Sequence, residues 1–139
     1  KVTLTSDDLK TFQGSNVKEQ GITLGNGNAV GPMEGVLLSA AGCSTIDIVM
    51  ILEKMRQPIE SIEVQVEGTR QDAIPRIFTH MHLHYILKGN LKDKKVKEAV
   101  NLSIDKYCSV VIMLAGTLSL FNPTFCEKSN NPVLKFNSF

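Results

Sequence analysis

The sequence predicts an α+β protein in which a long, central, buried helix and a second helix pack on a mainly antiparallel sheet. The apolar segment 35–52 contains one formal charge, Asp47, and has the length of a buried helix. Residues 62–67 and 78–87 then alternate between apolar and polar side chains with the period of a strand. The resulting order of strands, long helix, two strands, helix and strand is typical of the α+β class.

We expect a single domain, because 139 residues with 42% hydrophobic content suit one modest core. N-terminal strands are expected within residues 1–30, the core within 31–127, and a loose, polar tail over 128–139. The formal net charge of +1 argues against nucleic acid or a membrane surface as a partner. Three cysteines and an N-terminus without a signal-peptide core predict reduced thiols in the cytoplasm.

The first strands are predicted over residues 2–11 and 22–24, with glycine turns at Gly14 and over 25–28. The long helix is predicted over residues 32–56. It begins with a Gly-Pro pair and an acidic first turn, and basic residues occupy its last turn. Its length approaches that of a membrane span, but Asp47 would cost about 3 kcal/mol near a bilayer centre. We therefore predict a helix buried by protein.

The two strands after Pro58 are expected to form a hairpin. One face of the second strand is predicted to be mostly apolar, and the other to carry His80, His82 and His84. These histidines are expected opposite the polar residues of the first strand, which are Glu63, Gln65 and Glu67.

A second helix is predicted from Asp93, with a break near Cys108 and a continuation to Gly116. The segment 117–127 is predicted to be a final strand at a sheet edge, because Pro123 cannot donate a ladder hydrogen bond.

Two cysteines lie in the two most apolar stretches, Cys43 in the long helix and Cys108 in the second helical segment. A reactive thiol needs a neighbour that lowers its pKa from about 8.5. Cys108 would gain this from a helix that begins near Asp105. For Cys43 the activating group must come from elsewhere in the fold; the sequence offers Arg56, Arg70 and Arg76.

If the helices bring Cys43 and Cys108 together, the two thiols suit peroxide reduction through a sulfenic acid and a disulfide. An apolar pocket favouring organic hydroperoxides is expected from Val36, Leu37, Met50, Val111, Met113 and Leu114.

Three stretches carry a specific resemblance: GPMEGVLLSAAGCSTIDIVMILEKMRQ, PRIFTHMHLHYILKG and AVNLSIDKYCSVVIML. They resemble blocks of the OsmC/Ohr family, the osmotically induced and organic hydroperoxide resistance proteins, and especially its shorter YhfA-like branch. The resemblance covers residues 31–114. It implies an intertwined homodimer with two active sites at the subunit interface.

The resemblance also implies an enzyme, a thiol-dependent organic hydroperoxide peroxidase of oxidative or osmotic stress defence. Cys43 would be the peroxidatic and Cys108 the resolving cysteine, with Glu34 near the position of an activating glutamate but offset by one. No metal or organic cofactor is implied, and an external dithiol, in some members a lipoyl protein, would re-reduce the disulfide. The family also uses an arginine from an N-terminal strand, whereas this sequence has none before Arg56. Lys10, Lys18, or an arginine from elsewhere, including the partner subunit, would have to replace it.

Other interpretations remain open. The same fold could serve as a noncatalytic protein that binds an apolar ligand or senses redox state. The three histidines could chelate zinc or copper in neighbouring pairs, although a polar strand face is the simpler interpretation. Cys126 is expected to be a spectator. Asp47 is expected to have a structural role, accepting a hydrogen bond from Ser44 or Thr45 or contacting a partner chain.

Overall fold

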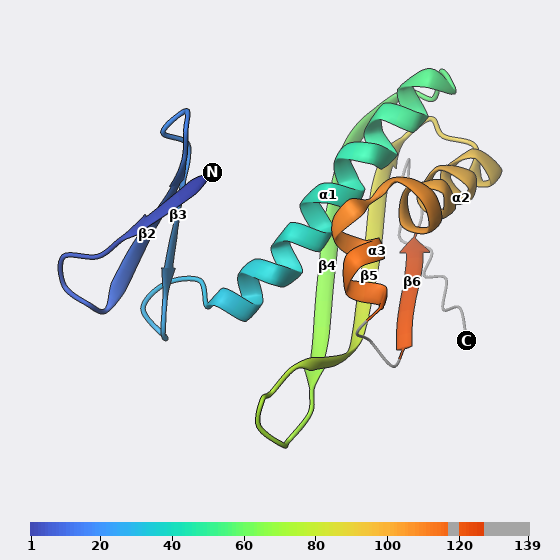
Figure 1. The fold of residues 1–139 in the computed structure, drawn as a ribbon. Coiled ribbons are helices and arrows are strands. Elements are labelled where there is room, and N and C mark those ends of the chain that lie inside the picture. Colours follow the sequence, from blue (N-terminus) through green and yellow to red (C-terminus); the bar gives the residue numbers. More distant parts are fainter. Residues whose placement is uncertain (117–119, 127–139) are drawn as a thin grey trace. The chain divides into compact units, whose positions relative to one another are not determined.

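The structure, a computed structural model, describes residues 1–116 and 120–126, and the side chains of the latter segment are not described. The chain divides into two compact units, residues 1–38 and 39–139. Helix α1 (Pro32–Lys54) runs across the boundary between them (Figure 1). The predicted tail over 128–139 lies outside the described residues.

The N-terminal unit contains an antiparallel sheet in the order β1 (Val2–Thr5), β2 (Thr11–Asn16) and β3 (Gly21–Gly25). The predicted strand over 2–11 is therefore too long. It ends at a turn in which the Asp8 carboxylate accepts hydrogen bonds of 2.8 Å from the backbone N–H groups of Lys10 and Thr11. These bonds lower the pKa of Asp8 to about 2.

Strand β2 was not expected, and the glycine turn predicted at Gly14 is wrong. Gly14 lies inside β2 and pairs with Ile22, because its lack of a side chain does not prevent strand pairing. The turn between β2 and β3 is closed instead by a bond of 3.0 Å from the Asn16 N–H to the Gln20 carbonyl. The bend predicted after residue 25 is present over 26–29.

Helix α1 begins at Pro32 as predicted but ends two residues early, at Lys54. Arg56 has a φ of 55°, so it lies in the left-handed region and cannot continue the helix. Four residues spaced by one turn are buried: Ala40, Ser44, Ile48 and Leu52. By length and composition α1 could also cross a membrane, but a helix buried in a protein core has the same properties.

The sheet of the second unit has the order β4 (Ile59–Arg70), β5 (Phe78–Gly89) and β6 (Leu120–Cys126). The predicted hairpin is confirmed as the antiparallel pair β4–β5, in which His84 faces Gln65 and His82 faces Glu67. His80 faces Thr69 and Glu63 faces Ile86, so those two parts of the predicted pairing are wrong by register. The last strand is at the edge as expected but pairs parallel to β5, since a helical crossover connects the two.

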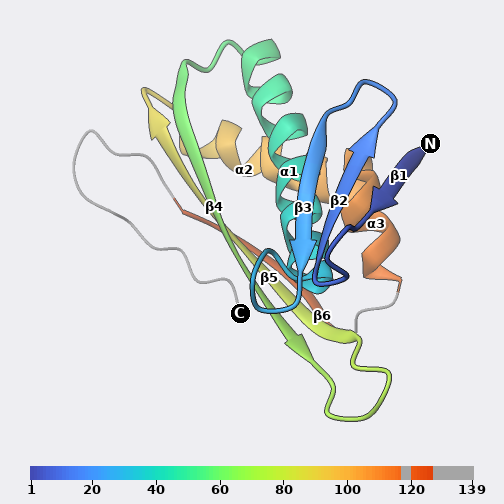
Figure 2. The same ribbon diagram turned by 90° about the vertical axis from the view of Figure 1, so that its left-hand side faces the viewer.

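The core of this unit lies on one face of β5, where Met81, Leu83, Tyr85 and Leu87 are at most 2% exposed. The views in Figures 1 and 2 place α1 from Ser39 onward, α2 (Asp93–Leu102) and α3 (Ser109–Ala115) on one side of this sheet. The break predicted near Cys108 is confirmed. A π-helical turn, η1 (Ser103–Tyr107), separates α2 from α3. The coarse prediction of an α+β fold with a long helix on a mainly antiparallel sheet is therefore correct.

Candidate active site

The two cysteines of the helical segments meet in the second unit. The Sγ atoms of Cys43 and Cys108 and a carboxylate oxygen of Asp47 all lie within 4.8 Å of one another. Both cysteines are free thiols; Cys43 is half-buried, whereas Cys108 is fully buried. Residues separated by 65 positions in the sequence are thus brought close enough to interact, and we call these three residues the thiol–Asp47 cluster.

Local helix geometry accounts for the cluster. Cys43 and Asp47 are four residues apart on α1, so their side chains lie one above the other on the same face. Cys108 lies at the junction of η1 and α3 in an extended conformation. Its N–H bonds to the Ser103 carbonyl five residues earlier, at 2.7 Å. This longer turn ends the first helical stretch and starts α3 at the next residue.

A buried hydrogen-bond network holds α1 beside the sheet at this level. The Tyr85 hydroxyl donates to Ser44 Oγ at 2.6 Å, and Ser44 Oγ donates to the Ala40 carbonyl at 2.8 Å. Ser103 Oγ donates to the Ser44 carbonyl at 3.0 Å, which links η1 to the same turn of α1. Ser44 directly follows Cys43, Ser103 lies five residues before Cys108, and both serines are 0% exposed, so the network fixes the segments that carry both thiols.

Burial raises the pKa of the Cys108 thiol to about 12, and the neighbouring Cys43 and Asp47 add to this rise. The nearby N–H of Val111 opposes the rise but is outweighed. The expectation that a helix start would favour a Cys108 thiolate is therefore wrong, since loss of water around the sulfur dominates. Cys108 is a protonated thiol at neutral pH.

Tyr85 belongs to the same environment. Burial raises the pKa of Tyr85 to about 12, against a lowering contribution from the bond with Ser44 and raising contributions from Cys108 and Cys43. The phenol consequently remains neutral beside the thiols and keeps its proton available for the bond to Ser44. The alternation of the sequence over 78–87 places Tyr85 on the mostly apolar face of its strand and indicates no further role for it. Its hydroxyl partner could not be identified without the fold.

Asp47 does not accept the expected hydrogen bond from Ser44 or Thr45. Ser44 donates to backbone carbonyls, and Thr45 Oγ1 and Asp47 Oδ2 are both buried with no partner among the described residues. Asp47, which carries this unpartnered oxygen, is a member of the thiol–Asp47 cluster. The sequence signal that could have revealed this is the spacing of four residues from Cys43.

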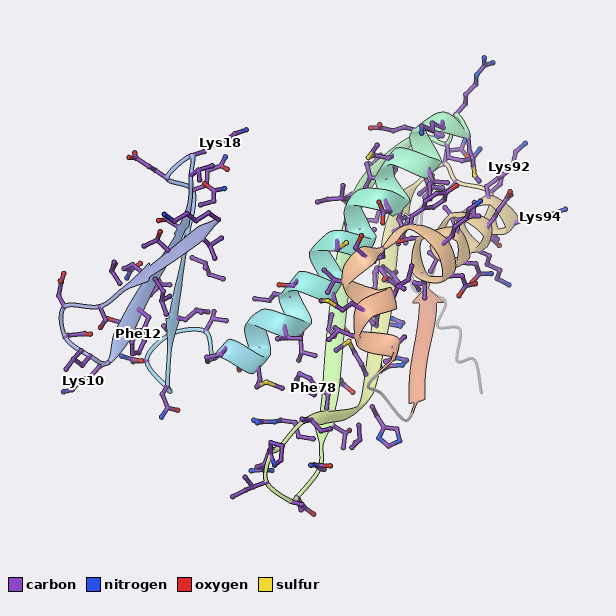
Figure 3. The ribbon with its side chains drawn as sticks, viewed as in Figure 1. Lys10, Phe12, Lys18, Phe78, Lys92 and Lys94 are labelled. Atoms are coloured by element: carbon purple, nitrogen blue, oxygen red, sulfur yellow. The ribbon has the colours of Figure 1, made fainter. Side chains whose placement is uncertain are left out.

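Glu34 lies in the N-terminal unit, where its Oε2 accepts a hydrogen bond of 2.7 Å from the Gly31 N–H. This bond is half of a capping box and stabilises the start of α1. The candidate cations Lys10 and Lys18 are also in this unit, at opposite ends of β2 (Figure 3).

Two of the arginines of the second unit, Arg70 and Arg76, donate hydrogen bonds elsewhere. Arg70 donates to the Arg76 carbonyl and Arg76 to the Gln71 carbonyl, within the β4–β5 loop. Arg56 follows the end of α1. Among the described residues, the charges that perturb Cys108 are Cys43 and Asp47, and no cation is among them.

A cavity of about 370 Å³ adjoins Asp47. Its other lining residues are largely apolar and come from α1 and the α2–η1 segment: Met50, Ile51, Lys54, Met55, Leu102 and Tyr107. This cavity coincides with the predicted pocket at Met50, and the rest of that pocket stays a prediction. Met50 lines the cavity, but Val111 is part of the core and Met113 is 69% exposed. Val36 and Leu37 belong to the N-terminal unit.

Within the described residues, His80, His82 and His84 do not form a group of three convergent ligands. The rings of His82 and His84 stack with centroids 6.4 Å apart. Among the described residues, the group whose potential ligand atoms converge is the thiol–Asp47 cluster. The side chain of Cys126 lies outside the described part of the chain, so its expected spectator role stays a prediction.

Comparison with known proteins adds four relationships. The family model described as OsmC-like protein matches residues 25–120. Protein YhfA of Escherichia coli (strain K12) is 45% identical over 114 residues, which cover 79% of this chain and 85% of YhfA. A solved hypothetical protein from Aquifex aeolicus VF5 is 30% identical with a TM-score of 0.85, over 93% of this chain and 95% of that chain.

The organic hydroperoxide resistance protein OhrB of Bacillus subtilis has a TM-score of 0.61 at 15% identity. The match covers 90% of this chain and 96% of that chain. At this level of identity the likeness concerns the fold alone.

Proposed function

The chain belongs to the OsmC-like protein family, and on this premise we propose that it is a thiol-dependent peroxidase that reduces organic hydroperoxides. The observation that carries the proposal is the approach of the Cys43 and Cys108 sulfurs to within 4.8 Å. A disulfide has an S–S bond of about 2.05 Å, so an approach of less than about 3 Å would join them.

The reaction has two steps on the protein. The Cys43 thiolate attacks the terminal oxygen of the hydroperoxide ROOH, the O–O bond breaks, and the leaving alkoxide takes a proton to become ROH. Cys43 is then a sulfenic acid. The Cys108 sulfur attacks it, the hydroxyl leaves with the Cys108 proton as water, and the disulfide forms. An external dithiol supplies two electrons and two protons to restore both thiols.

The environments of the two thiols support this order. Cys43 is half-buried and therefore accessible to substrate, while Cys108 is fully buried. Since burial raises the pKa of Cys108 to about 12, its sulfur is a poor first nucleophile at neutral pH. The Cys108 sulfur reacts in the second step, when Cys43 has become a sulfenic acid. Glu34 is retained as a proposed activating residue on the resemblance alone, and its capping bond is an equally sufficient reason for its position.

We further propose that the protein works as a homodimer in the cytoplasm. Two large apolar residues on α1, Ile46 and Met50, are 62% and 50% exposed, and Met113 on α3 is 69% exposed. Covering such side chains with a second copy would be favourable. Sedimentation equilibrium checks this point, with a monomer at micromolar concentration as the contrary result.

A second candidate function is noncatalytic binding of an apolar ligand or redox sensing. The cavity of about 370 Å³ beside Asp47, lined by Met50 and Met55, favours binding. Its volume suits a small apolar molecule or part of an acyl chain. A binder would leave the ligand unchanged and its thiols reduced, and this difference separates it from the peroxidase. A redox sensor would be oxidised by hydroperoxide but would not turn over.

Mass spectrometry of the reduced protein provides the test. One equivalent of cumene hydroperoxide is added, and an equal dose of hydrogen peroxide serves as the comparison. We expect rapid loss of two hydrogens, mapped by peptides to Cys43 and Cys108 and faster with the organic peroxide. The Cys43→Ser variant should show no such loss. Thiols that stay reduced would reject the peroxidase and favour the binding protein.

A further inference from the structure

The thiol–Asp47 cluster contains a carboxylate oxygen whose position hydrogen bonding does not explain. Asp47 Oδ2 is buried and has no hydrogen-bond partner among the described residues. No ion pair involving Asp47 is found among the described residues either. A buried carboxylate oxygen without a partner is costly, so such an atom calls for a physical reason.

The neighbouring groups do not compensate for the cost of burying this oxygen. The Asp47 carboxylate has the two cysteine sulfurs as cluster neighbours, and thiols are weak hydrogen-bond donors. A carboxylate and two ionisable thiols gathered within 4.8 Å repel one another when charged. A cation placed among them would satisfy the carboxylate and both sulfurs together.

The donor set specifies the type of cation. Two cysteine sulfurs with one carboxylate oxygen suit a thiophilic divalent ion such as zinc, whereas magnesium and calcium take oxygen ligands. Zinc bonds of about 2.3 Å to sulfur and 2.0–2.2 Å to oxygen require donor atoms roughly 3.5–4 Å apart. Donors already within 4.8 Å reach this spacing by moving about 1 Å. Cys43 and Asp47 on one rigid helix face supply two of the three in fixed relation.

We propose that the reduced protein binds one zinc-like divalent cation per chain through Cys43 Sγ, Cys108 Sγ and an Asp47 carboxylate oxygen. Each protonated thiol releases its proton to solvent as its sulfur bonds the metal. A water molecule completes the tetrahedron in the fourth position.

The site is linked to redox state, and this regulatory consequence rests on the proposed peroxidase function. A metal-bound pair withholds its sulfur lone pairs from peroxide. Conversely, oxidation of the pair by ROOH consumes two protons, yields the disulfide, ROH and water, and frees the cation because two of its three protein ligands are lost. Zinc would therefore inhibit turnover, and oxidation would release zinc.

Metal binding is measured without any peroxide. Reduced protein carrying Cys126→Ser, to remove the third thiol, competes for zinc with a chromophoric chelator. Cobalt is used separately as a spectroscopic probe. We expect one cation per chain and a sulfur-to-cobalt charge-transfer band in the near ultraviolet. Converting the same protein to its disulfide with diamide should abolish both signals, and this comparison needs no further substitution.

Variants assign the ligands. Cys43→Ser and Cys108→Ser should each weaken the charge-transfer band, whereas Asp47→Asn should keep the band and weaken zinc binding about tenfold or more. Asp105→Asn is the matched control, since Asp105 is an exposed carboxylate of η1 outside the cluster. The proposal is overturned if the reduced protein takes up no stoichiometric zinc, or if Asp47→Asn binds as tightly as Asp105→Asn.

The two proposals fail separately. Thiols that react with cumene hydroperoxide in a protein that binds no zinc would reject the metal site alone. Stoichiometric zinc binding in a protein whose thiols ignore hydroperoxides would reject the peroxidase and leave the metal site in place.

Discussion

The Tyr85 hydroxyl lies 2.6 Å from Ser44 Oγ, which joins the central strand of the second sheet to the residue after Cys43. Both side chains are 0% exposed. The Ser44 hydroxyl also donates a hydrogen bond to the Ala40 carbonyl, so it has a second partner that does not depend on Tyr85. The position of the reactive turn of α1 is therefore coupled to the sheet through one phenol.

Tyr85→Phe is expected to lower the free energy of unfolding by about 0.5–1.5 kcal/mol, the net value of one buried hydrogen bond. Ser44 remains satisfied by Ala40, which keeps the cost in this range. Urea denaturation measures it. Tyr107→Phe is the matched control, because Tyr107 is 49% exposed. Equal effects of the two substitutions would contradict the importance of the buried bond.

Alkaline titration should resolve Tyr85. Burial raises its pKa from 10.0 to about 12 in the folded protein, so between these values the unfolded chain loses the phenolic proton first. The contribution of Tyr85 to the free energy of unfolding is accordingly complete below pH 10. It falls as the pH rises towards 12, by at most about 1.4 kcal/mol per pH unit. Unfolding measured across this range, with and without Tyr85→Phe, should show a shallower decline in the variant. An unchanged slope would argue against the raised pKa.

Glu34 can be tested for its two roles separately. Glu34→Ala removes the bond to the Gly31 N–H and should cost about 0.3–1 kcal/mol at the start of α1. Glu34→Gln keeps an acceptor oxygen and should retain most of that stability while losing the charge. If Glu34 activates the thiol, Glu34→Gln lowers peroxidase kcat/KM with little change in Tm. Glu53→Gln, an exposed change on the same helix, is the control. Full activity in Glu34→Gln would leave capping as its role.

Cys108→Ser separates the two chemical steps. The variant should reduce one equivalent of hydroperoxide and stop, with Cys43 trapped as a sulfenic acid, because the second sulfur is missing. A dimedone adduct on Cys43, detected by mass spectrometry, is the readout. Cys43→Ser should show no turnover. Multiple turnovers by Cys108→Ser, supported by the dithiol reductant, would show that Cys108 is dispensable.

Disulfide formation should make the protein harder to unfold. The bond would close a loop of 65 residues, for which the loss of chain entropy in the unfolded state corresponds to about 4 kcal/mol in the simplest model. The oxidised protein is therefore expected to unfold at higher urea than the reduced protein. Cys108→Ser, treated with the same oxidant, is the control and should not shift upward. A lower midpoint for the oxidised form would indicate strain that exceeds the entropic gain.

The sequence predicted the elements whose patterns are long or strongly periodic. Helix α1 and the β4–β5 hairpin were predicted because an apolar run with end signals and a strict alternation each have one simple structural interpretation. Strand β2 was missed, since Gly14 resembles a turn residue until Ile22 is known to face it. The parallel pairing of β6 was missed because strand direction depends on the crossover and not on the strand's own residues.

The thiol pair was predicted from the apolar setting of each cysteine and from the family resemblance, but its electrostatics were not. Whether Cys108 is a thiolate or a thiol depends on the loss of water around its sulfur, which is a property of the packed structure. Asp47 illustrates the same limit. Its spacing from Cys43 was visible in the sequence, whereas its orphan oxygen appears only once neighbouring hydroxyls are seen to bond elsewhere.

The π-helical turn before Cys108 makes the chemistry sensitive to chain length at one point. The bond from the Cys108 N–H to the Ser103 carbonyl spans one residue more than an α-helical bond. Deleting a single residue between them would permit a regular helix, in which each residue turns the chain by about 100° around the helix axis. The sulfur of Cys108 would then turn away from Cys43 while every functional side chain was still present. Insertions and deletions in this segment should therefore reduce the activity more than substitutions do. A variant one residue shorter would keep both cysteines, but their sulfurs would no longer lie close together.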